Sequence, residues 1–205
     1  MAKIPAGILG SITGKVGNVV GASWKGINYI REYVIPANPN TDAQKAERDL
    51  FRDIVSLASA ALGPVLQVFV DPFLRAQSAW AYFIGKARGT YLVQGVYNDI
   101  ILTKGTLEGA VIISAVYGAA NCVVTWSSAV LGNGSLTDLA CVFIYDRANK
   151  VGWFDSSNTR ADEGAIVAVG AGRVAIDLQC WLFFADHATA PTIKSYSDFE
   201  QASAA

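Results

Sequence analysis

The chain has 205 residues, which is enough for one domain of ordinary size together with a substantial appendage. Hydrophobic residues make up 52% of it and charged residues only 16%, well below the roughly 25% typical of soluble domains. We therefore expect part of its apolar surface to be buried against other subunits. No run approaches the roughly 18 consecutive apolar residues of a membrane-spanning helix, so no span is predicted.

Charge is divided unevenly along the chain. The first 31 residues contain Lys3, Lys15, Lys25 and Arg31 and no acidic residue, so they carry +4 and leave −5 for the remainder of a chain whose total is −1. Such a division allows the N-terminal segment of one copy to be attracted by the body of another, and it equally allows contact with nucleic acid.

Residues 1–40 are predicted to be an extended, glycine-rich arm followed by a linker. Glycines recur between Gly7 and Gly26 among β-forming residues, and interior glycines at this density destabilise a helix and favour extended chain with turns. We expect one or two short strands, with a hairpin through Gly21–Gly26, before Pro36–Asn40 breaks regular structure.

An extended arm of this kind is able to add a strand to an exposed sheet edge of another subunit. Its valines, aromatic residues and cations are the side chains available for such a contact. The residues predicted to make this assembly contact are Lys15, Val16, Val19, Val20, Trp24, Lys25, Ile27, Tyr29 and Arg31.

Residues 41–88 are predicted to be helical. Thr41-Asp-Ala-Gln44 fits a capping box, in which the side chains of Thr41 and Gln44 satisfy free backbone donors at the start of a helix. Gly63-Pro64 is expected to end this helix. A second helical stretch is expected from Val65 to about Ile84, restarted or kinked at Asp71-Pro72.

From Gly89 onward the pattern changes to short β-rich runs separated by turn residues, which is typical of a β-sandwich or small barrel. We assign residues 89–200 to an antiparallel β-sandwich of the immunoglobulin type and residues 201–205 to a tail. The expected fold class of the whole chain is α+β, mainly β. The predicted strands are Asn98–Thr103, Ala110–Tyr117, Cys122–Ser127, Leu139–Asp146, Val151–Phe154, Ala165–Val169, Arg173–Ala185 and Thr192–Tyr196.

The sequence gives little support to a catalytic or metal site. His187 is the sole histidine, which excludes a histidine-rich metal site and any mechanism that needs two imidazoles. Gly10–Lys15 departs from a phosphate-binding loop, because three residues instead of four separate its glycines and Val16 stands where a hydroxyl is needed. We therefore predict no catalytic residue, no cofactor and no metal, and expect a protein that is not an enzyme.

The cysteines Cys122, Cys141 and Cys180 are odd in number, widely spaced and set among apolar strand residues. Buried thiols explain this pattern better than a disulfide framework or a zinc site, and they fit synthesis in a reducing compartment. The stretch Met1–Gly21 lacks the unbroken apolar run of an export signal, so we expect synthesis in the cytoplasm.

Several motifs resemble an uncharacterised family, domain of unknown function 6266. They are Gly7–Gly21 followed by Ser23–Arg31, the linker Asn38–Gln44, the segment Leu102–Ala110 and the late strand Trp181–Phe184. The resemblance covers nearly the whole chain. It implies a source among Bacteroidetes-type bacteria or their phages, and it implies no activity, since the family has no catalytic residues to transfer.

Three functions follow from these observations. The first is a structural subunit of a phage particle, a capsid-associated, spike or tail component that forms homo-oligomers and contacts other virion proteins through the arm. The second is a β-sandwich that binds a glycan or a host surface through loop aromatic residues such as Trp153 and Phe154. The third is a nucleic-acid-associated protein. In it, Lys15, Lys25 and Arg31 would grip the nucleic-acid backbone, and the interleaved Trp24, Tyr29 and Tyr33 would stack on bases.

Overall fold

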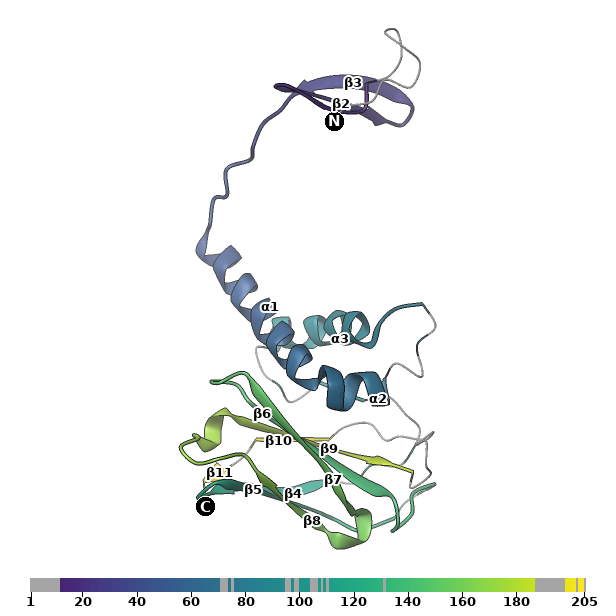
Figure 1. Cartoon of the computed structure of the whole chain (residues 1–205), viewed down its shortest axis with the longest axis vertical. Helices are drawn as coiled ribbons and strands as arrows, with labels where there is room; N and C mark the ends of the chain where they lie inside the picture. The colour runs from purple at the N-terminus through teal and green to yellow at the C-terminus, as the bar shows by residue number, and fades with distance from the viewer. Residues whose placement is uncertain are drawn as a thin grey trace. The chain divides into compact units, whose positions relative to one another are not determined.

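The structure is a computed structural model with two compact units, Met1–Thr41 and Asp42–Ala205, each of which is described by itself. It confirms a chain that is α+β and mainly β, with helices and three small sheets (Figure 1). The residues that it describes are 12–70, 74, 76–94, 97, 100–103, 107, 109, 111–130, 132–186, 198–201 and 203–204.

The first unit contains an antiparallel sheet of three strands, β1 (Gly14–Val16), β2 (Val19–Trp24) and β3 (Ile27–Glu32), in the order β1-β2-β3. One or two strands in an extended arm were expected, so the segment is more folded than predicted. The reason lies in two-residue turns: Gly17 has φ +57°, and Lys25 and Gly26 have φ 49° and 83°. Positive φ at these positions gives turns whose twist matches that of the flanking strands.

The second unit opens with helix α1 (Asp42–Ala61), which begins directly after Thr41 as predicted. The prediction that Gly63-Pro64 ends the helix is wrong, because the chain continues through a π-helical turn (Leu62–Leu66) into α2 (Gln67–Phe69). Proline lacks an N–H and clashes with the carbonyl four residues before it. A wider π turn relieves that clash and lets the helix continue.

The helix that we predicted from Val65 to about Ile84 is helical at both ends, in the continuation of α1 as far as Phe69 and in helix α3 (Ala79–Gln94). α3 runs on to Gln94, beyond the change to β structure that we predicted at Gly89. Ser78 marks its start, because its side-chain oxygen accepts a hydrogen bond from the backbone N–H of Ala81 at 3.3 Å. The predicted restart at Asp71-Pro72 lies outside the described residues.

The described residues of the second unit also form two four-stranded sheets, in the orders β10-β9-β6-β7 and β11-β4-β5-β8. Their neighbouring strands are antiparallel except for the pair β11 and β4. The strands are β4 (Ile112–Gly118), β5 (Asn121–Trp126), β6 (Leu139–Asp146), β7 (Val151–Thr159), β8 (Gly164–Ala168), β9 (Leu178–Ala185), β10 (Asp198–Gln201) and β11 (Ser203–Ala204).

Strand β6 has the predicted bounds, and β4, β5 and β8 lie within one or two residues of theirs. β7 extends to Thr159 instead of ending at Phe154, and β9 begins at Leu178 because a 3₁₀ turn, Ala175–Asp177, precedes it. No strand forms at 100–103, and the predicted strand Thr192–Tyr196 lies outside the described residues.

Strands β6 and β9 separate two hydrophobic cores, because their side chains alternate between the two faces of one sheet. Cys141, Phe143 and Tyr145 face the helices and pack there with residues of α1 and α3. Val142 and Ile144 face the other sheet and pack with residues of β4, β5 and β8. The helices therefore cover one sheet, and the second sheet covers its other face.

Candidate interaction surface

The register of the N-terminal sheet places most of the predicted contact residues on one face. Lys15, Val20 and Arg31 form one cross-strand row, because Lys15 pairs with Val20 and Val20 with Arg31. Directly paired residues of an antiparallel sheet project from the same side. The pairs Ala22–Tyr29 and Trp24–Ile27 continue this side, which we call the basic face: Lys15, Val20, Ala22, Trp24, Ile27, Tyr29 and Arg31.

The basic face is largely uncovered. Trp24 is 68% exposed, Ile27 70% and Tyr29 43%. These are large apolar side chains, which a folded protein normally removes from water. The face combines exposed aromatic area with two cations and contains no acidic residue.

Aromatic rings hold two of the lysines of this sheet in place. The ammonium of Lys15 lies 3.5 Å from the ring centroid of Tyr33, and that of Lys25 lies 5.8 Å from the ring of Trp24. Tyr33 follows β3 directly, and its N–H donates to the carbonyl of Asn18 at 2.7 Å. These cation–π contacts fix positive charge beside the exposed aromatic rings.

The opposite face of the sheet carries Val16 and Val19, which pair with each other. Gly21 is also on this side, and a Cβ at that position would lie 2.1 Å from the carbonyl oxygen of Ile12. The backbone of Ile12 therefore passes directly over Gly21, which must remain a glycine. Of the nine predicted contact residues, six thus lie on the basic face, Val16 and Val19 lie on the other, and Lys25 lies in the turn.

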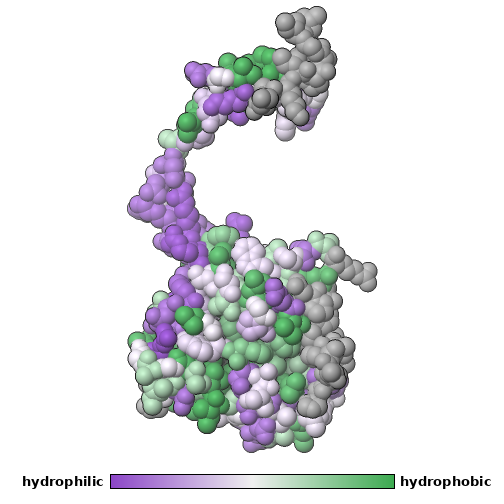
Figure 2. Space-filling view, in the orientation of Figure 1, coloured by the Kyte–Doolittle hydropathy of each residue, from purple (hydrophilic) through white to green (hydrophobic). Residues whose placement is uncertain are grey.

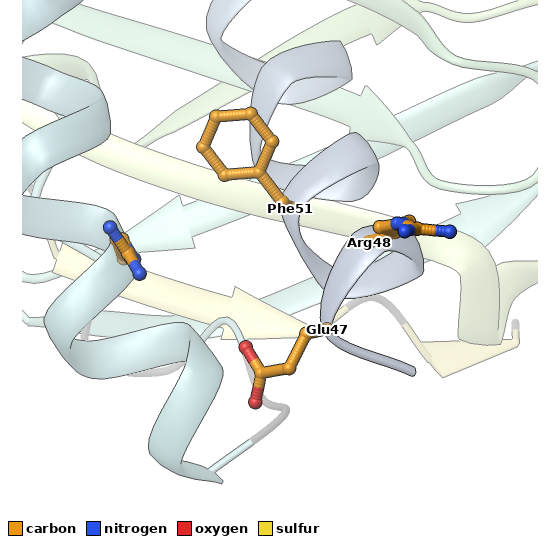
Figure 3. Close-up of a pocket in the computed structure, with 4 residues that line it drawn as sticks. Glu47, Arg48 and Phe51 are labelled. Atoms are coloured by element: carbon orange, nitrogen blue, oxygen red, sulfur yellow. The ribbon is translucent and has the colours of Figure 1, made fainter. Parts of the chain in front are cut away.

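Helix α1 has a strongly polar first half, which Figure 2 shows as a hydrophilic segment. A hollow of about 310 Å³ lies beside it, lined by Glu47, Arg48, Phe51 and Arg88. The side chains labelled in Figure 3 spread apart from α1 and do not converge on one point. The hollow therefore lacks the converging polar groups of a small-molecule site.

The outer face of the sheet containing β4, β5 and β8 is the second uncovered apolar surface. Val123 pairs with Ile166, and the two side chains are 38% and 68% exposed. Beside this pair the hydroxyls of Ser114 and Thr125 share a hydrogen bond of 2.8 Å. The outward residues of these three strands are uncharged, so this surface favours contact with another protein over exposure to water.

One buried ion pair was not predicted from the sequence. The guanidinium of Arg160 lies 3.5 Å from the carboxylate of Asp138, and the two side chains are 0% and 5% exposed. Arg160 also lies over the ring of Phe184, and its carbonyl accepts a hydrogen bond from the indole of Trp126 at 3.1 Å. These contacts surround Arg160 with protein, so its role is to organise the loops around it.

Among the described residues, the remaining candidates do not form a catalytic arrangement. Trp153 and Phe154 lie in strand β7 and are half-buried against the two cores, so they are not the loop aromatics that the glycan-binding hypothesis requires. Asp162 accepts hydrogen bonds from the backbone and hydroxyl of Thr159, which lower the pKa of its carboxyl. His187 lies outside the described residues.

Two further features bear on metal binding and on membrane insertion. In the part of the chain that the structure describes, no three His, Cys, Asp or Glu residues are placed to hold a metal ion. The helical run Asp42–Phe69 is long and apolar enough to cross a membrane by length and composition, a test that the core helix of a soluble protein also passes. Its residues Ile54 and Leu57 are buried in the core beneath the helices.

Comparison with known proteins adds a family and no activity. A family model described as "Family of unknown function (DUF6266)" matches residues 11–196. No curated protein and no solved structure matches the chain.

Proposed function

The chain belongs to this family of unknown function, DUF6266, and we propose that it is a non-enzymatic structural subunit of a phage particle, assembled through its N-terminal sheet. The observation that carries the proposal is the exposure of Trp24, Ile27 and Tyr29 on one face of a small sheet.

A sheet of this size has little interior of its own. Among residues 12–41 only Gly21 is fully buried, and it has no side chain to contribute. Three strands need a hydrophobic face packed against something else to be stable. A partner that covers Trp24 and Ile27 supplies that packing, at roughly 25 cal/mol for each Å² of apolar surface removed from water.

Charge favours a second copy of the chain as this partner. The N-terminal unit, residues 1–41, carries +3, from three lysines, Arg31 and Glu32, and residues 42–205 carry −4, which together give the net charge of −1. Opposite charges on the N-terminal sheet of one copy and the body of another steer the two together. Identical copies that exchange such contacts form rings or open arrays, which are the arrangements of particle shells and tails.

The proposal also covers the arrangement of the sheets, the source of the protein, its location and its partners. The two four-stranded sheets of the body would have an immunoglobulin-like arrangement. The protein would be made in the cytoplasm of a Bacteroidetes-type bacterium and end in the virion. Homo-oligomeric contacts and contacts with other virion proteins are the expected interactions, with no cofactor involved.

Removal of residues 1–35 tests the proposal. We expect the truncated protein to stay folded, because α1 begins its own helix at Asp42, and to become monomeric while the full chain forms oligomers at micromolar concentration. Circular dichroism reports the fold, and sedimentation velocity with light scattering reports the mass. A full-length chain that is monomeric, or a truncated chain that assembles normally, contradicts the proposal.

Two point variants test whether assembly depends on the basic face or on any exposed aromatic side chain. Trp24→Ser removes a side chain that is 68% exposed on the basic face, and Trp80→Ser removes one that is 36% exposed on α3. We expect only Trp24→Ser to weaken the oligomer. Equal weakening by both variants argues against this face.

The basic face also favours a second candidate function, the binding of single-stranded nucleic acid. Its row of Lys15 and Arg31 lies beside Trp24 and Tyr29, residue types that contact phosphates and stack on bases. Fluorescence anisotropy with a labelled oligonucleotide tests it over a range of salt concentrations. Binding that weakens steeply with salt supports this function, and no binding at low salt eliminates it.

A further inference from the structure

The core between the two four-stranded sheets brings two thiols together. Cys122 lies on the core side of β5 and Cys180 on the core side of β9, and both are 0% exposed. Their Sγ atoms are 3.9 Å apart, although 58 positions separate the residues in sequence. Facing sheets lie about 10 Å apart, so short side chains from opposite sheets meet midway.

We propose that Cys122 and Cys180 form a disulfide bond between the two sheets when the protein encounters an oxidising environment. The bond would clamp β5 to β9 at the centre of the core. It requires the sulfur atoms to approach from 3.9 Å to about 2.0 Å, a change that side-chain rotation and small movements of the facing strands supply. The proposal is independent of assembly through the N-terminal sheet.

The third cysteine does not compete for this bond. Cys141 lies on β6, where it pairs with Phe183, and its side chain belongs to the core beneath the helices. Cys122 and Cys180 belong to the other core, on the opposite side of that sheet. The chain thus contains its own control, a buried thiol whose core cluster contains no other cysteine.

The contact between the two thiols also affects their reactivity. The hydrogen bond between the two thiols lowers the pKa of the Cys122 thiol, and burial opposes this effect. The thiolate is the reactive form in disulfide exchange. In the folded protein, this contact therefore favours the reactive form of Cys122.

The oxidant is a low-molecular-weight disulfide such as oxidised glutathione. The Cys122 thiolate attacks one of its sulfur atoms, which forms a mixed disulfide and releases one glutathione thiol. Cys180 then loses its proton and attacks the Cys122 sulfur, which forms the protein disulfide and releases the second thiol. Two protein thiols are oxidised, and one small disulfide is reduced to two thiols.

Burial determines when this reaction takes place. A thiol that is 0% exposed meets the oxidant only when the body opens or before it has folded. Exchange in the folded protein should therefore be slow. Refolding in a glutathione buffer should give the bridge efficiently.

The test uses the full chain refolded from urea, once with excess reduced glutathione and once with excess oxidised glutathione. After denaturation, iodoacetamide should label three cysteines in the first sample and one in the second, and peptide mapping should find Cys122 joined to Cys180. Because the bond closes a loop and restricts the unfolded chain, the oxidised protein should melt about 10 °C higher than the reduced protein.

Matched variants complete the test. Cys141→Ala should keep both the bridge and the rise in melting temperature, whereas Cys122→Ala and Cys180→Ala should lose both. Three labelled cysteines after oxidative refolding overturn the proposal, and so does a bond that involves Cys141 or a second chain. Intact mass under non-reducing conditions distinguishes these results.

Discussion

At the scale of single residues, the buried pair of Arg160 and Asp138 makes a sharp prediction about stability. Both side chains are almost fully buried, and the guanidinium also lies 3.9 Å from the ring centroid of Phe184. Arg160→Met keeps much of the volume and leaves the carboxylate of Asp138 without its cation. We expect a loss of about 3 kcal/mol in the free energy of unfolding, measured by urea denaturation.

Arg147→Met is the matched control, because Arg147 and Asp177 are also 3.5 Å apart but their side chains are 46% and 22% exposed. Solvent screens this second pair, so its loss should cost about 1 kcal/mol or less. Comparable losses for the two variants would show that burial of the Arg160 pair contributes nothing extra.

Asp146 makes a prediction about pH. Burial raises the pKa of its carboxyl, but hydrogen bonds from Asn149, Arg173 and the backbone of Ala148 outweigh this effect and leave the pKa lowered. The side chain of Asn149 donates at 2.7 Å and that of Arg173 at 3.0 Å. A carboxyl with a lower pKa in the folded state stabilises the protein above its unfolded pKa of about 3.9 and loses this contribution as pH falls through the folded value.

We expect the unfolding free energy of the wild type to fall on acidification below about pH 4, and to fall less steeply in Asp146→Asn. Asn149→Ala removes one donor and keeps the charge, which brings the folded pKa closer to the unfolded value, so its acid-dependent loss of stability should be smaller than in the wild type and complete at a higher pH. Urea titrations between about pH 2 and 7 measure both effects. If the unfolding free energy falls with acid in the same way in all three proteins, Asp146 does not contribute to the pH dependence of stability.

At the scale of elements, Gly152 permits helix α1 to pack against the sheet. A Cβ at this position would lie 2.8 Å from the ring of Phe143 and 3.2 Å from the Cβ of Ala60 on α1. Phe143 is fully buried and has little room to move. Gly152→Ala should therefore lower the unfolding free energy by about 1–3 kcal/mol, in thermal or urea denaturation.

Gly63→Ala provides the comparison, because nothing lies within 4 Å of a Cβ at Gly63, in the π-helical turn. There the methyl group restricts the unfolded chain, and stability should stay the same or rise by up to about 1 kcal/mol. If Gly152→Ala were as well tolerated as Gly63→Ala, the close packing of α1 would not limit stability.

The sequence predicted those elements whose signals are local. Strand β6 was found with its bounds because an apolar run ends at Asp146 before a turn, and α1 was found from its cap at Thr41. The π-helical turn was missed, because Pro64 normally ends a helix. Tertiary packing overrides that rule: Val65 and Leu66 are buried in the core.

The candidate sites also combine features that the local sequence predicts with features that depend on tertiary structure. The aromatic and cationic residues of the N-terminal segment were identified from composition, but their separation into two faces depends on a register set by the turns at Gly17 and Lys25-Gly26. The contact between Cys122 and Cys180 was beyond sequence reasoning, because it depends on how two sheets face each other.

At the scale of the whole molecule, opposite charges are proposed to steer assembly. The position of a charged residue should therefore affect self-association more than the net charge of the chain does. Lys15→Glu with Arg31→Glu reverses both cations of the basic face. Lys45→Glu with Arg52→Glu makes the same change in net charge on α1, where both residues are exposed and lie beside Asp42 and Asp49.

We expect the first double variant to weaken self-association roughly tenfold, which corresponds to about 1.4 kcal/mol, and the second to change it little. Sedimentation equilibrium measures the association constants, and circular dichroism checks that both variants are folded. The difference should shrink as added salt shortens the screening length from about 10 Å at 0.1 M to about 3 Å at 1 M. Equal weakening of the two variants would instead mean that net charge controls assembly, because repulsion between whole bodies does not depend on which cations are reversed.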